Sequence, residues 1–120
     1  MKDQRIALVT GAAGTMGKAV VAMFLQEGHT VVMVDIDKAG MEQISQEYAS
    51  GSRDGRLYLR SFDISDSESV EQNIAEIEET VGGVDILVNN AGILSNHKIM
   101  ETTPEEWSRV LSVNLNGAFY

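Results

Sequence analysis

Three glycines at regular spacing follow the first apolar segment of the chain: Gly11, Gly14 and Gly17. Glycine lets a backbone turn sharply and approach a pyrophosphate, and the N–H groups that open a helix stabilise the phosphate charge. A nucleoside-triphosphate loop is excluded because Lys18 is followed by Ala19, which cannot ligate Mg²⁺. The segment therefore predicts a dinucleotide pyrophosphate site, with a glycine-rich turn that binds nothing as the alternative.

An acidic residue stands where a dinucleotide site would need one. Asp35 lies eighteen positions after Gly17, at the end of the second predicted strand. A carboxylate at about 20 residues from the glycines can accept hydrogen bonds from both hydroxyls of an adenosine ribose, and it repels a 2′-phosphate. The next cation is Lys38, and Asp37 adds negative charge. The pattern therefore favours NAD over NADP, with a solvated acid at a strand end as the alternative.

Alternating strand and helix patterns must position these residues. Runs of apolar and β-branched residues predict strands, and apolar residues three and four apart predict helices. The order β-α-β-α-β-α-β-α predicts an α/β fold, the N-terminal portion of a Rossmann-type doubly wound parallel sheet, with residues 1–120 as one NAD(P)-binding domain. We expect strands at 6–9, 30–34, 57–62 and 84–88, and helices at 15–27, 38–48, 66–81 and from 104 onward.

Capping residues and glycines predict the ends of these elements. Two capping boxes, 65–68 (Ser-Asp-Ser-Glu) and 103–106 (Thr-Pro-Glu-Glu), predict the starts of the last two helices, with Pro104 at a first helical position. Gly28 stands where a helix C-cap is expected. The polar segment 51–55 predicts a turn-rich loop.

Asn114 lies on the apolar side of the last predicted helix. It shares that helical face with Trp107 and Leu111. A polar side chain on a buried face must find hydrogen-bond partners. We therefore expect Asn114 to be buried and hydrogen-bonded, with a structural asparagine as the alternative to a functional one.

The composition excludes several classes of function. Eighteen acids against nine bases give a formal charge of −9, which opposes binding to nucleic acids and to anionic membranes. The longest apolar run has seven residues, far short of the roughly 20 needed to span a bilayer. Cysteine is absent, so thiolate metal ligands and disulfides are ruled out. We expect a cytoplasmic protein with no metal, no nucleic acid and no membrane partner.

Four features lie at characteristic distances along the chain. They are the turn at Gly11, Asp63 after the third predicted strand, the segment 89–92 (Asn-Asn-Ala-Gly) after the fourth, and Asn114. Together they resemble the N-terminal half of the short-chain dehydrogenase/reductase family over essentially the whole chain. The resemblance implies an NAD-dependent oxidoreductase that transfers hydride between nicotinamide and a small-molecule alcohol or ketone, and it implies a homo-oligomer.

The resemblance also implies roles for individual residues. One group would line the pyrophosphate turn, a second would hold the adenosine, and a third would pass beneath the cofactor and pin the central strands. These positions are Gly11, Thr15, Met16 and Gly17 for the turn, Asp35, Ile36, Asp63 and Ile64 for the adenosine, and Asn89, Ala91 and Gly92 beneath the cofactor. Asn114 would be the catalytic asparagine that holds a water in a proton relay.

The glycine spacing departs from the commonest branch of that family. The family pattern is Gly-x-x-x-Gly-x-Gly, whereas here Thr15 takes the second glycine position and Gly14 stands one place earlier. This spacing is closer to an extended, epimerase-like branch. That branch does not usually carry the 89–92 segment or the segment around Asn114. We therefore favour the oxidoreductase branch.

The remaining catalytic residues of the family are not found in the sequence. The family uses a serine and a Tyr-x-x-x-Lys motif, and none of Tyr48, Tyr58 and Tyr120 has a lysine four positions on. We therefore expect a fragment of a longer enzyme, truncated at its C-terminus and lacking the serine, tyrosine and lysine. The alternative is a non-catalytic NAD(H)-binding module. His97 falls in a loop that borders the substrate pocket in the family, although a plain surface loop is the preferred interpretation.

Overall fold

The computed structural model describes residues 3–49 and 55–120. The strands in this part of the chain form one sheet in the order β3-β2-β1-β4, and every neighbouring pair is parallel. The predicted parallel α/β arrangement is confirmed. The strands are β1 (Ile6–Thr10), β2 (Thr30–Val34), β3 (Leu57–Arg60) and β4 (Ile86–Val88).

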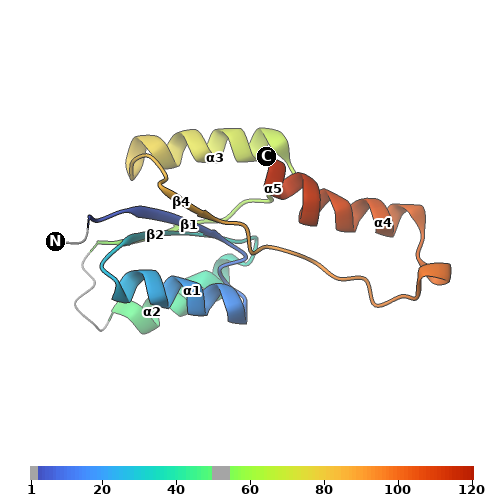
Figure 1. Cartoon of the computed structure of the whole chain (residues 1–120), viewed down its shortest axis with the longest axis horizontal. Helices are drawn as coiled ribbons and strands as arrows, with labels where there is room; N and C mark the ends of the chain where they lie inside the picture. Colours follow the sequence, from blue (N-terminus) through green and yellow to red (C-terminus); the bar gives the residue numbers. More distant parts are fainter. Residues whose placement is uncertain (1–2, 50–54) are drawn as a thin grey trace.

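Helices cover both faces of this sheet. α1 (Thr15–Gln26) and α2 (Lys38–Ala49) lie on one face, and α3 (Ser67–Thr80) lies on the other (Figure 1). Each helix follows a strand and returns the chain to the start of the next parallel strand, which is the connection that parallel pairing requires. The doubly wound layout expected from the alternating pattern is therefore confirmed.

Two apolar cores hold the layers together because successive strand residues point to opposite faces. The core beneath α1 and α2 contains Val9, Val21, Leu25, Val31, Met33, Met41 and Ile44. The core beneath α3 contains Leu8, Val32, Val34, Phe62, Val70 and Ile77. Every residue of β2 is buried, which explains why this strand reads as a continuous apolar run rather than an alternating one.

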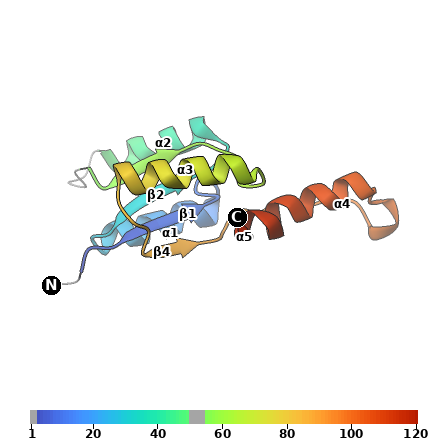
Figure 2. The same cartoon turned by 90° about the horizontal axis from the view of Figure 1, so that it is seen from above.

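The last part of the chain extends away from the sheet (Figures 1 and 2). A 3₁₀ turn at Ile99–Glu101 leads into α4 (Pro104–Leu111), and a π-helical segment at Ser112–Asn116 leads into α5 (Gly117–Phe119). The sequence pattern predicts one uninterrupted helix here and gives no sign of the π-helical segment. We call residues 93–120 the arm.

Two predicted strands are shorter in the structure. β3 ends at Arg60 rather than 62, because its partner β2 ends there and Val34 pairs with Arg60. β4 begins at Ile86 rather than 84, where pairing with β1 starts. Just before it, the Asp85 carboxylate accepts a hydrogen bond of 2.9 Å from the backbone N–H of Ile6.

The capping box expected at 65–68 is wrong by one residue. Asp66, not Ser65, is the N-cap of α3, and its side chain accepts from the backbone N–H groups of Glu68 and Ser69. The Ser65 hydroxyl instead donates to Asp63, as does the Ser65 backbone N–H. The second box is confirmed at its N-cap, where the Thr103 side chain accepts from the N–H of Glu106.

Glycines are predicted to end α1 at Gly28 and to form part of a loop at 51–55. Gly28 has a φ of +89°, so the expected left-handed turn after α1 is confirmed. The predicted loop at 51–55 falls outside the described residues except for Gly55.

Asn114 is exposed, so the expectation of burial is wrong. The face it shares is exposed as well, with 54% of Trp107 and 36% of Leu111 accessible. The physical reason is the direction of the arm, which carries α4 past the end of the sheet rather than across a face of it (Figure 2). The second half of the expectation holds, because Asn114 is hydrogen-bonded.

Candidate functional site

Segments that follow all four strands meet at one end of the sheet. β2 and β3 lie on one side of β1 and β4 on the other, so the strand order reverses at β1, where open α/β sheets bind ligands. A pocket of about 330 Å³ opens at this place. Its lining includes seven of the predicted cofactor-binding residues: Gly11, Asp35, Ile36, Asp63, Ile64, Ala91 and Gly92.

Other lining residues were not singled out by the sequence. Val34 and Phe62 belong to the core beneath α3, and Ser65 and Ile93 adjoin predicted positions. Arg109, Ser112 and Val113 come from the arm. The sequence pattern of the last helix does not predict that these three arm residues face the strand ends. Thr15, Met16, Gly17, Asn89 and Asn114 are not among the lining residues.

A larger and more open hollow, of about 580 Å³, lies between α3 and the end of the chain. It is lined by residues of α3 together with Phe119 and Tyr120. None of the predicted site residues takes part in it. The pocket at the strand ends is therefore the candidate functional site.

Two of the three spaced glycines are required by close packing. Gly11 has a φ of +64°, and a side chain there would place a Cβ 2.9 Å from the Cα of Ala91. A Cβ on Gly17 would collide with the carbonyl oxygen of Gly11 and lie 2.8 Å from the Cα of Ala12. At Gly14 the nearest contact would be an ordinary 3.4 Å. The turn is therefore shaped by Gly11 and Gly17.

The N-terminus of α1 faces outward without a side-chain cap. Its N-cap is Gly14, which has no side chain to accept a hydrogen bond, and no acid stands in the first turn. Met16 is 71% exposed, and Thr15 is exposed as well. The opening N–H groups of an uncapped helix carry a partial positive charge that favours an anion.

The Asp35 carboxylate is held against the glycine turn. One of its oxygens accepts from the backbone N–H of Ala13 at 3.0 Å, and the other accepts from the N–H of Asp37 at 3.0 Å. Each carboxylate oxygen has two lone pairs. Both oxygens therefore keep acceptor capacity, and the two hydrogen bonds fix the orientation of a carboxylate that lines the pocket.

Asp63 is fixed by a turn of its own. Its Oδ1 accepts from the backbone N–H of Ser65 at 2.9 Å and from the Ser65 hydroxyl at 2.7 Å. Within the described residues the structure shows no hydrogen bond to Oδ2. Asp63 therefore presents a second oxygen that can accept from a ligand.

Asn90 fastens the end of β4 to the glycine turn. Its side-chain amide donates to the carbonyl oxygens of Thr10 at 3.1 Å and Gly11 at 3.2 Å. The Thr10 hydroxyl accepts from the backbone N–H groups of Asn90 and Ala91, each at 3.0 Å. The pinning expected of Asn89 is thus carried by Asn90 and Thr10. The exposed Asn89 side chain shows no hydrogen bond within the described residues.

Asn114 fastens the arm to the loop after β4. Its Oδ1 accepts from the backbone N–H of Ile93 at 2.8 Å, and its Nδ2 donates to the carbonyl oxygen of Ile93 at 2.9 Å. A Cβ on the neighbouring Gly92 would lie 3.4 Å from Oδ1. The side-chain amide of Asn114 therefore holds the loop beside the pocket.

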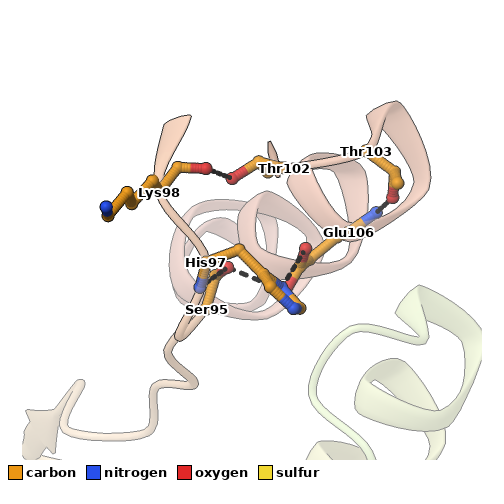
Figure 3. Close-up of polar contacts among 6 residues, drawn as sticks. All are labelled: Ser95, His97, Lys98, Thr102, Thr103 and Glu106. Atoms are coloured by element: carbon orange, nitrogen blue, oxygen red, sulfur yellow. Dashed lines mark hydrogen bonds and ion pairs between the residues drawn. The ribbon is translucent and has the colours of Figure 1, made fainter. Parts of the chain in front are cut away.

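A second polar cluster closes the outer end of the arm (Figure 3). The Nδ1 of His97 lies 2.8 Å and 2.9 Å from the two carboxylate oxygens of Glu106, and the Ser95 hydroxyl donates to Oε1 at 2.7 Å. A carboxylate only accepts, so Nδ1 carries the proton. These contacts, the one from His97 foremost, lower the pKa of Glu106 below its ordinary value of 4.5. We call Ser95, His97 and Glu106 the clasp.

Within residues 3–49 and 55–120, no three side chains of the metal-binding types lie together as a metal site. Over the same residues, no helix has both the length and the apolar character needed to cross a membrane.

Comparison with known proteins gives the family. The short chain dehydrogenase family model matches residues 5–120. A 3-oxoacyl-[acyl-carrier-protein] reductase of Thermotoga maritima is 34% identical over 117 residues, which cover 98% of this chain and 47% of the relative.

Solved structures agree with this match. A short-chain dehydrogenase/reductase (glucose/ribitol dehydrogenase) from Brucella melitensis has a TM-score of 0.88 at 32% identity, covering 97% of this chain and 48% of the other. An alcohol dehydrogenase from Thermococcus sibiricus, complexed with 5-hydroxy-NADP, has a TM-score of 0.88 at 26% identity, covering 98% and 49%. The chain spans about half the length of the relatives it matches. It belongs to the short-chain dehydrogenase/reductase family.

Proposed function

We propose that residues 1–120 form the cofactor-binding domain of an NAD-dependent oxidoreductase, which transfers hydride between nicotinamide and the carbon of an alcohol or ketone. The observation that carries the proposal is the pocket at the strand ends, where Asp35 and Asp63 converge with the glycine turn. Family membership supports the nicotinamide class of cofactor. The choice of NAD over NADP rests on Asp35.

The pocket and the N-terminus of α1 together fit the parts of a dinucleotide. The uncapped N-terminus of α1, with Thr15, Met16 and Gly17, suits a pyrophosphate. Asp35 retains acceptor capacity for two ribose hydroxyls, with Ile36 beside it. The second oxygen of Asp63 suits the amino group of an adenine, and Ile64 borders the same space.

The bound nicotinamide would give or take the hydride, and the chain's own groups would bind and orient it. Ala91 brings its backbone close to Gly11, Asn90 keeps it there, and Gly92 lines the same pocket. Asn89 stays a predicted contact beneath the cofactor. Asn114 stays the predicted catalytic asparagine. Its amide makes one hydrogen bond at Oδ1 and one at Nδ2, both to the backbone of Ile93, and keeps a second lone pair and a second N–H that could hold a relay water.

The alternative function is a module that holds NAD(H) without doing chemistry. The Tyr-x-x-x-Lys motif is not found in these 120 residues, and both functions are consistent with that. The coding sequence after codon 120 separates the two: a reading frame that continues and encodes a Tyr-x-x-x-Lys motif would support the oxidoreductase, whereas a stop codon would support the module. The expected substrate class, homo-oligomer and cytoplasmic location stay predictions.

Calorimetric titration of the chain with NAD and with NADP tests the proposal. We expect NAD to bind more tightly, because the fixed carboxylate of Asp35 accepts from the ribose and repels a 2′-phosphate. Asp35→Ala should weaken NAD binding by roughly tenfold, since a hydrogen bond to a charged group is worth about 1.5–3 kcal/mol. Its effect on NADP should be smaller.

A matched control removes one negative charge outside the pocket. Glu105→Ala does so on the exposed side of α4, and it should leave the ratio of the two affinities unchanged. Equal affinities of the unmodified chain for NAD and NADP would refute the role of Asp35. Failure to bind either dinucleotide would refute the proposed function.

A further inference from the structure

Arg109 is a cation in a pocket otherwise charged by acids. It reaches the lining from α4, while Asp35 and Asp63 reach it from the ends of β2 and β3. No other lysine or arginine is among the lining residues. Across residues 3–49 and 55–120, the guanidinium of Arg109 makes no ion pair within 4.0 Å of a carboxylate. Its charge acts on Glu106 one turn away without a direct contact.

The charge of the lining argues against a phosphate as the partner of Arg109. An anion placed beside the guanidinium of Arg109 would also meet the carboxylates of Asp35 and Asp63, whereas the pyrophosphate proposed above lies at the N-terminus of α1. A neutral, flat ring meets no such repulsion. A guanidinium is planar and weakly hydrated, and it stacks on aromatic rings and on bases.

The apolar lining points to the same ligand. Ile36 is 73% exposed at the mouth of the pocket, and Ile64 and Val113 line it with their aliphatic side chains. Such surface suits the faces of a ring, while the free oxygen of Asp63 suits a donor on its edge. Arg109 reaches this space from the arm, whereas the acids reach it from the segments that follow β2 and β3.

We propose that Arg109 binds the adenine ring by laying its guanidinium plane on the ring face, so that the arm takes part in cofactor recognition. This inference rests on the proposed function and extends it to a residue outside the predicted site. It also gives the extended arm a role, because Arg109 can contact adenine only while Asn114 and Ile93 hold the arm beside the strand ends.

Calorimetric titration with adenosine and with 2′,5′-ADP separates stacking from charge pairing. Arg109→Ala should weaken adenosine binding by about fivefold, the effect expected of a cation–π contact of about 1 kcal/mol. Arg109→Lys should recover little of that loss, because an ammonium has no plane to stack. Raising the salt concentration should leave the loss for adenosine largely unchanged.

Lys98→Ala is the matched control, since it removes one exposed positive charge of the arm outside the pocket. It should bind adenosine as the unmodified chain does, and circular dichroism should show all variants folded. A loss confined to 2′,5′-ADP and recovered by lysine would overturn stacking in favour of phosphate pairing. Unchanged adenosine binding in Arg109→Ala would overturn the inference alone, whereas no adenosine binding by the unmodified chain would overturn it together with the proposed function.

Discussion

At the scale of single residues, the three spaced glycines have unequal roles. A Cβ on Gly17 would run into the backbone of the turn, whereas a Cβ on Gly14 would meet only an ordinary contact. The sequence spacing treats all three alike. The difference arises because Gly17 packs directly against the backbone of Gly11 across the turn, whereas the space around Gly14 is not crowded. Gly14 is the glycine that departs from the family spacing, and it therefore stands where glycine is not required.

Substitution by alanine should show this difference. Gly17→Ala should lower the free energy of unfolding by about 1–3 kcal/mol through overpacking. Gly14→Ala should lower it by less than about 1 kcal/mol, the difference between glycine and alanine at an N-cap. Urea denaturation of both variants provides the measurement. Equal losses would mean that the turn relaxes around the new methyl group.

The neighbouring residues Asn89 and Asn90 also have different roles. Adjacent positions 89 and 90 carry the same residue type, so residue identity does not say which one fastens β4. Both residues follow the end of β4, and only the Asn90 side chain donates to the carbonyl oxygens of Thr10 and Gly11, 80 and 79 positions away in sequence. The 89–92 motif could be predicted from the sequence, but which of its two asparagines holds β4 against the glycine turn depends on the tertiary structure.

At the scale of elements, α3 has an unfavourable distribution of charge. Glu76, Glu78 and Glu79 stand near its C-terminal end, where the helix dipole is negative, and no basic residue lies in its last turn. Arg60 brings a cation to this end by donating to the hydroxyl of Thr80 at 3.0 Å. The first turn, with Glu68, has the favourable sign.

Charge reversals at the two ends of α3 should therefore act in opposite directions. Glu79→Lys should raise the free energy of unfolding by about 0.3–1 kcal/mol, and Glu68→Lys should lower it by a similar amount. Both variants change the net charge by the same amount. The effect of weaker overall repulsion on the free energy of unfolding therefore cancels when the two variants are compared. Thermal unfolding at low and high salt is the measurement. If the stability difference between the two variants were the same at high salt as at low salt, the helix dipole would not be its cause.

The clasp makes the arm sensitive to acid. The pKa of Glu106 is lowered in the folded chain, chiefly by the hydrogen bond from His97. A group with a lowered folded pKa contributes stability above its unfolded pKa and loses it as the pH falls through the folded pKa. The contribution of Glu106 is therefore complete above its ordinary value of 4.5 and is lost below it.

Glu106→Gln tests the clasp by removing the titrating group. The stability difference between this variant and the unmodified chain should shrink as the pH falls from about 6 to about 3, because the carboxyl becomes protonated. Urea unfolding at several pH values measures this difference. Glu105→Gln is the control, since its carboxyl lies outside the clasp, and it should show little change. A constant difference for Glu106→Gln would contradict the expected titration.

At the scale of the whole molecule, the sheet and its three helices form two well-packed cores, whereas the arm is exposed. The large apolar side chains accessible on the arm include Leu94, Met100, Trp107, Leu115 and Phe119. Exposed apolar surface of this extent is typical of protein that meets another surface. The arm nevertheless lines the pocket through Arg109, Ser112 and Val113, so it belongs to the candidate site as well.

Features that depend on neighbours along the chain could be predicted from the amino acids alone. Apolar runs set the strands, helical spacing set α1 to α3, and the glycine turn with Asp35 indicated the dinucleotide site. Tertiary structure decided what depends on residues far apart: Asn90 rather than Asn89 as the fastener, the exposure of Asn114, and Arg109 in the pocket wall. The physical reason is that local patterns report backbone preference, whereas burial and partners depend on where each element lies in the folded chain.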